Sequence, residues 1–128
     1  MSYYFSKRLD MPFEEAVNTA IEALQKYGFG VLTDIDVKAT LKKKIDVDFR
    51  NYRILGACNP PFAHQALQAE DKIGLMLPCN VIVQEHPDGA VEVAAIDPVA
   101  SMANVNNPGL SGIGMEVRKK LEAVIEDL

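Results

Sequence analysis

The sequence predicts an α+β protein with two layers, in which helices cover largely one face of a mixed, mainly antiparallel sheet. Apolar residues recur at three- and four-residue spacing in segments 12–27 and 108–128, and β-rich segments lie before and between these two helices. The tight turn Pro87-Asp88-Gly89 joins the last two strand-like segments into a hairpin. The expected element order is therefore β-α-β-α-β-α-β-β-α. With 128 residues and no shift in composition, the chain is expected to form a single domain, 1–128.

The first half of the chain alternates between strand and helix signals. Segment 3–9 is short and aromatic, which indicates a strand. Segment 12–27 has one apolar stripe, Pro12 suits its first turn, and Gly28 suits its end because glycine adopts the left-handed conformation without steric cost. Segment 29–35 is expected to be a strand. Asp36 is then expected to cap a short lysine-rich helix that ends near residue 45.

The second half begins with an expected strand over 52–58. Asn59 is placed to cap a helix that starts at Pro60 and ends near residue 71. Segment 73–85 is the most strand-like part of the chain, since apolar residues alternate from 75 to 83, and Pro78 indicates an edge position or a bulge. A last strand is expected over 91–96. The pairs at 97–98 and 107–108, each an N-cap residue followed by proline, predict a short helical turn and the final helix.

Composition and charge limit the partners and the compartment. The net charge is −5, and the basic triplets 42–44 and 118–120 lack interleaved aromatic residues, so no nucleic-acid partner is expected. No apolar run approaches the ~20 residues of a membrane span, and the N-terminus lacks the features of a signal peptide, so the expected compartment is the cytoplasm. A sheet with one uncovered face would be stabilised by a second copy, which predicts a homodimer.

Two Cys-Asn dipeptides form the strongest candidate site, Cys58-Asn59 and Cys79-Asn80. Cys58 directly precedes a helix N-terminus, where unpaired N–H groups and the helix dipole favour a thiolate. His64 lies one and a half turns into the same helix. If the strands that carry the cysteines are neighbours and antiparallel, both thiols lie at one sheet edge, and with an imidazole they suit a soft or borderline metal ion or a redox pair. If the strands are parallel, the site does not form.

Purely structural thiols are the competing interpretation. Free cysteine is among the most buried residue types, and Cys79 lies within an aliphatic stripe. No Cys-x-x-Cys motif occurs, and the spacing of the two cysteines matches no established metal motif. Metal ligands, catalytic residues and cofactors are therefore left unassigned.

Several segments together resemble the bacterial family catalogued as domain of unknown function 302. They are YGFGVLT at 27–33, DFRNYRILG at 48–56, ACNPP at 57–61, LPCN at 77–80 and AIDP at 95–98. The resemblance runs from about residue 27 to 121 and weakly includes the first strand and helix. It implies a compact α+β domain that tends to dimerise, and it brings no activity with it. Both Cys-Asn segments fall inside the family pattern.

Three functions follow as hypotheses. The leading one is a homodimer that binds a small ligand or a soft metal ion near Cys58, Asn59, His64, Cys79 and Asn80. The second is an enzyme with thiol-dependent redox activity that uses Cys58, with Cys79 as the resolving thiol. The third is a protein–protein adaptor whose cysteines are structural.

Overall fold

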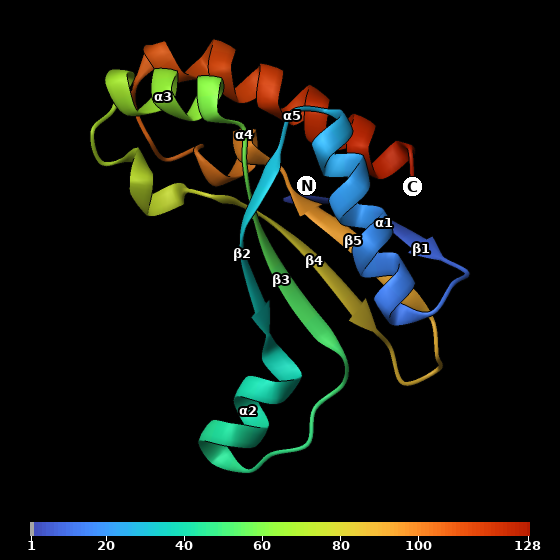
Figure 1. Cartoon of the computed structure of the whole chain (residues 1–128). Helices are drawn as coiled ribbons and strands as arrows, with labels where there is room; N and C mark the ends of the chain where they lie inside the picture. Colours follow the sequence, from blue (N-terminus) through green and yellow to red (C-terminus); the bar gives the residue numbers. More distant parts are fainter. Residues whose placement is uncertain (1) are drawn as a thin grey trace.

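Within residues 2–128, which the computed structural model describes, a five-stranded antiparallel sheet runs through the molecule (Figure 1). Its strands are β1 (Tyr4–Leu9), β2 (Gly30–Asp36), β3 (Tyr52–Cys58), β4 (Cys79–Glu85) and β5 (Val91–Ile96). They lie in the order β1-β5-β4-β3-β2, and each neighbouring pair is antiparallel. The α+β class is confirmed. The sheet is antiparallel throughout the described chain, so the expected mixed component is not found.

Helices cover one face of this sheet. The helices of the described chain are α1 (Phe13–Lys26), α2 (Val37–Ile45), α3 (Pro60–Ala69), α4 (Pro98–Ser101) and α5 (Ser111–Glu126), with 3₁₀ turns η1 (Ile73–Met76) and η2 (Pro108–Leu110), and α2 lies apart from this face. α1 packs on β2, β4 and β5, α5 packs on β1 and β5, and the two helices contact each other. α3 lies beside α5 at one end of the sheet (Figure 1). No helix within residues 2–128 is both long and apolar enough to cross a bilayer.

Strand register places one set of side chains under the helices. Leu55, Val81 and Ala95 lie opposite one another on β3, β4 and β5, and all three are buried. They belong to the main hydrophobic cluster, which α1 and α5 complete from above. A satellite cluster centred on Ala66, Ile73 and Leu110 forms under α3, η1 and η2. The core therefore consists of two parts that meet near α5.

Segment 73–85 is only partly a strand. Residues 73–76 form the 3₁₀ turn η1, Leu75 is 86% exposed, and β4 begins at Cys79. β4 lies between β5 and β3, so Pro78 is neither at a sheet edge nor in a bulge, and that prediction was wrong. Proline has no N–H to donate to a neighbouring strand, and this proline lies just before the first paired residue of a central strand.

The opposite face of the sheet is uncovered in the described chain. Ile54, Ile82 and Ala94 lie side by side along it, and a hollow of about 400 Å³ extends over Ile82 and Ala94 between Tyr4 and Tyr52. α2 projects away from the sheet beyond the ends of β2 and β3 (Figure 1), and none of its residues is buried. The carboxylate of Asp36 caps α2 as expected, accepting a hydrogen bond from the Ala39 N–H at 3.0 Å.

Candidate functional site

An apolar cavity of about 300 Å³ lies between the main and satellite hydrophobic clusters, where the two do not pack fully against each other. It is bounded by the end of β3, the first turns of α3, the segment before β4, α4 and α5. Phe29 and Val117 of the main cluster form one side, and Ala66 and Leu77 of the satellite cluster form the other. The cavity is thus a packing gap between the two hydrophobic clusters, and its wall consists of residues from both.

Local sequence explains why Cys58 and Asn59 reach this cavity. β3 ends at Cys58, and the Asn59 side-chain oxygen accepts a hydrogen bond from the Phe62 N–H at 3.4 Å, which caps α3. Pro60 follows in the first turn, where its missing N–H leaves no bond unmade. This strand-to-helix junction sets both residues in the cavity wall, as the N-cap signal indicated.

Strand pairing brings the two cysteines together. β3 and β4 are antiparallel neighbours, and Ala57 lies directly opposite Cys79, so Cys58 is the next residue along the chain. Both cysteines line the cavity, and both are free thiols. The two thiols therefore lie at the same end of neighbouring antiparallel strands, which is the first of the two alternatives considered from the sequence.

The two thiols differ in their surroundings. Cys79 is 7% exposed, and its burial, together with the nearby Cys58, raises the pKa of its thiol to about 11. At neutral pH Cys79 is therefore a neutral, protonated thiol and a poor nucleophile. Cys58 is half-buried at the end of its strand. Any chemistry that requires a thiolate must therefore begin at Cys58.

His64 and Asn80 do not line the cavity. Phe62 and Ala66 turn the inner side of α3 toward it, and His64, two residues from each, is exposed on the outer side. Asn80 follows the cavity residue Cys79 on a strand, so its side chain points to the uncovered face of the sheet. No cluster of three or more His, Cys, Asp or Glu side chains that could hold a metal ion occurs in residues 2–128. Of the five predicted site residues, Cys58, Asn59 and Cys79 share the cavity.

Sequence reasoning missed the part of the wall that comes from α4 and α5. Met102, Ile113 and Gly114 line the cavity there. α4 is held by Asp97, which is buried and accepts hydrogen bonds from the Val99 N–H at 3.0 Å and from the Arg118 Nε at 3.1 Å. The Asp97-Pro98 pair did predict the helical turn, but only the tertiary contact with α5 shows which space it closes.

The fold and site define a class of small α+β proteins with helices on one sheet face and an apolar cavity at the end of the sheet. A family model described as domain of unknown function DUF302 matches residues 5–128, and the chain belongs to this family. The match confirms the resemblance seen in the sequence and extends it over the first strand and helix.

A solved structure shows the same architecture. The crystal structure of an uncharacterized conserved DUF302 protein from Bacillus stearothermophilus matches with a TM-score of 0.90 and 27% identity, and the match covers 98% of each chain. No curated protein matches the chain.

Proposed function

We propose that this protein binds a small, uncharged and mainly apolar molecule in the cavity beside Cys58 and Cys79. The observation that carries the proposal is the chemistry of the wall. Among residues 2–128, no Asp, Glu, Lys, Arg or His side chain lines the cavity, and the volume of about 300 Å³ lies at the lower end of the range for ligand pockets. A charged ligand would lose its hydration there without gaining a partner, whereas an apolar one displaces water from apolar surface.

Asn59 and Cys58 supply the polar contacts that would orient such a ligand. The Asn59 oxygen is engaged in capping α3, which leaves its amide N–H groups as the donors on this side of the wall. The Cys58 thiol is a weak donor and a soft acceptor next to it. One carbonyl or ether oxygen on the ligand matches this pair.

The test is binding of N-phenyl-1-naphthylamine, a neutral apolar fluorophore, measured by fluorescence and confirmed by calorimetry. Ala63 lines the cavity and is half-buried on α3, so Ala63→Leu should fill part of the space and weaken binding at least tenfold. Ala39→Leu makes the same change on the exposed surface of α2 and should leave binding unchanged. No binding, or equal loss in both variants, would refute the proposal.

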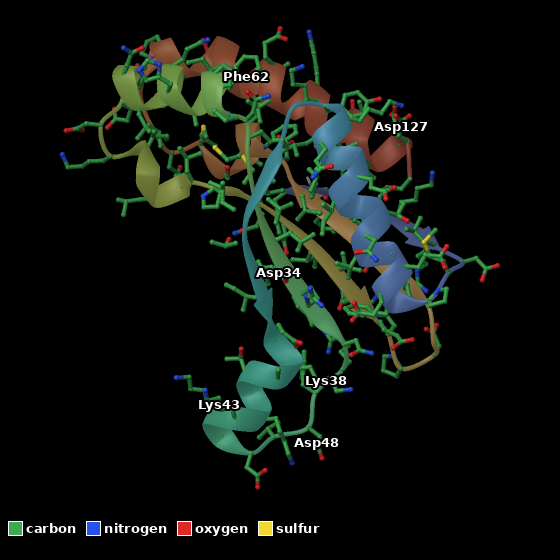
Figure 2. The ribbon with its side chains drawn as sticks, in the orientation of Figure 1. Asp34, Lys38, Lys43, Asp48, Phe62 and Asp127 are labelled. Carbon is green, nitrogen blue, oxygen red and sulfur yellow. The ribbon has the colours of Figure 1, made fainter. Side chains whose placement is uncertain are left out.

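Thiol chemistry at Cys58, or a soft metal ion, is the second candidate, because both cysteines line one cavity. Met102, a third sulfur-containing residue, lines the same cavity. Sulfur atoms are visible in the region between α3 and α4 in the side-chain view (Figure 2). Tight Cu(I) binding that is lost in both Cys58→Ser and Cys79→Ser would support the metal. Rapid formation of a Cys58–Cys79 disulfide with glutathione disulfide would support redox activity.

A homodimer in the cytoplasm is the setting that we propose for this protein. The uncovered sheet face, with Ile54, Ile82 and Ala94 at its centre, supports the dimer, and two free thiols fit a reducing compartment. Light scattering should give the mass of two chains, and Ile82→Lys should give the mass of one. A weak dimer has a Kd on the order of 100 µM, so a wild-type protein that is still monomeric at or above this concentration would refute the dimer.

A further inference from the structure

A second cavity of about 260 Å³ lies directly beside the first one. Pro98, Met102 and Gly114 line both cavities, so the two spaces share a wall built from α4 and one position of α5. The first cavity extends to the end of β3 and the start of β4, where Ala57 and Cys79 are buried. The second opens between α4, η2 and the start of α5, where Val99 and Met115 are exposed.

Gly114 is the position where the two cavities adjoin. It is buried in the interior of α5, where glycine is less favourable than alanine. A Cβ atom at this position would meet only Val99 Cγ2, at 3.8 Å, which is ordinary van der Waals contact. Neither a close backbone approach nor a left-handed conformation requires glycine here. Its effect on the structure is to leave open space in the shared wall.

Met102 forms the other part of that wall. Its side chain is half-buried, unbranched and flexible, and it borders both cavities. Asp97 holds α4 in place through its hydrogen bonds to Val99 and Arg118, so the side chain can move while the backbone stays fixed. The residues that border both spaces are thus Pro98, the flexible Met102 and Gly114.

The two cavities differ in polarity. The second cavity is lined in part by Ser111 and Asn107. The Ser111 hydroxyl donates to the Pro108 carbonyl, which leaves its oxygen lone pairs available as acceptors. The amide of Asn107 is engaged with Ala69 and Glu70. In the described chain this second cavity is also lined by no charged side chain.

We propose that the two cavities form one site for a neutral single-chain amphiphile, such as a long-chain alcohol or primary amide. The apolar chain lies in the first cavity and passes Met102 and Gly114, and the polar head donates a hydrogen bond to Ser111. An ionised fatty acid should bind less tightly than the neutral amphiphile, because no cationic side chain lines either cavity to pair with its carboxylate. This inference names the ligand class for the proposed binding function and depends on it.

The test measures displacement of N-phenyl-1-naphthylamine by octan-1-ol and by tetradecan-1-ol. The wild-type protein should bind the longer alcohol at least tenfold more tightly, and it should bind tetradecanoate at least tenfold more weakly than the alcohol. Val99 lines only the second cavity, so Val99→Phe should reduce the preference for the longer chain while binding of the fluorophore is retained. Gly114→Ala should act in the same direction, with an unchanged or raised unfolding midpoint.

Gly112→Ala is the matched control, because Gly112 lies on the same helix, lines neither cavity, and has no atom within 4 Å of the point where a Cβ would lie. It should leave both affinities unchanged. If Val99→Phe and Gly114→Ala keep the full chain-length preference, or if tetradecanoate binds as well as the alcohol, the inference is overturned while fluorophore binding still supports the single-cavity function. If the fluorophore fails to bind, the proposed function itself is overturned.

Discussion

Replacing Gly114 by alanine should stabilise the protein. Alanine is favoured over glycine by about 0.5–1 kcal/mol in a helix interior, mainly because glycine loses more backbone freedom on folding. The added methyl group makes one ordinary contact, with Val99 Cγ2 at 3.8 Å, so no steric penalty offsets this gain. The free energy of unfolding should rise by about 0.5–1 kcal/mol, which for a domain of this size raises Tm by roughly 2–5 °C.

Urea denaturation followed by circular dichroism measures this change, with the slope m used to check that the unfolded state is unaltered. Gly112→Ala should also be neutral or stabilising, since a Cβ there has no neighbour within 4 Å. Gly28→Ala should be destabilising, since Gly28 has a φ of +87° and its Cβ would lie 3.1 Å from the Asn59 amide nitrogen. A loss of stability in Gly114→Ala would show that the shared wall is closely packed, which refutes the reasoning about its open space.

Three further predictions concern the core, α4 and α2. The unfolded Cys79 thiol ionises near pH 9 and the folded one near about 11, so the unfolded state loses its proton first. The free energy of unfolding should fall as the pH rises from 9 to 11, with a contribution from Cys79 of roughly 2–3 kcal/mol. The fall should be smaller in Cys79→Ala, in which only other groups with raised pKa values such as Tyr27 and Lys26 remain, and equal pH profiles for the two proteins would contradict the prediction. Asp97→Ala removes the cap of α4 and the partner of Arg118, so chemical denaturation should show a loss of about 2 kcal/mol, and a neutral effect would show that α4 is held otherwise. α2 has no buried residue, so hydrogen exchange followed by mass spectrometry should find its amides far less protected than those of α1; comparable protection would point to a partner that covers α2.

The fold was largely predictable because its signals are local. Prolines and cap residues mark the starts of α3, α4 and η2, and the apolar stripe of α1 has the period of a helix. Segment 73–85 misled the prediction, because alternation continues through Leu75 and Leu77 although only the part from Cys79 onward finds strand partners. Pairing is a tertiary event, and periodicity alone does not reveal where it begins.

The candidate site was predictable in part. Cys58 and Asn59 follow from a strand end next to a helix cap, and Cys79 joins them because β3 and β4 pair antiparallel. His64 and Asn80 are near these residues in sequence but point elsewhere, since side-chain direction changes along both a helix and a strand. No pattern in the sequence predicts the cavity itself. It exists because two hydrophobic clusters pack separately, and only the three-dimensional arrangement determines how far apart they stay.

The projecting position of α2 has a consequence for how relatives of this fold can diverge. Asp36 of β2 lies opposite Arg53 of β3 in the strand register, so the two strands are still paired at the point where the chain leaves the sheet. Lys38, Lys43 and Asp48 lie on this excursion, well away from the helices that cover the sheet (Figure 2). The chain rejoins the sheet before β3, because the Arg50 Nε donates to the Gln84 side-chain oxygen and the Glu85 N–H donates to the Asn51 carbonyl. Changes of length or charge within residues 37–48, where no residue is buried, should therefore disturb the body that carries the cavity least.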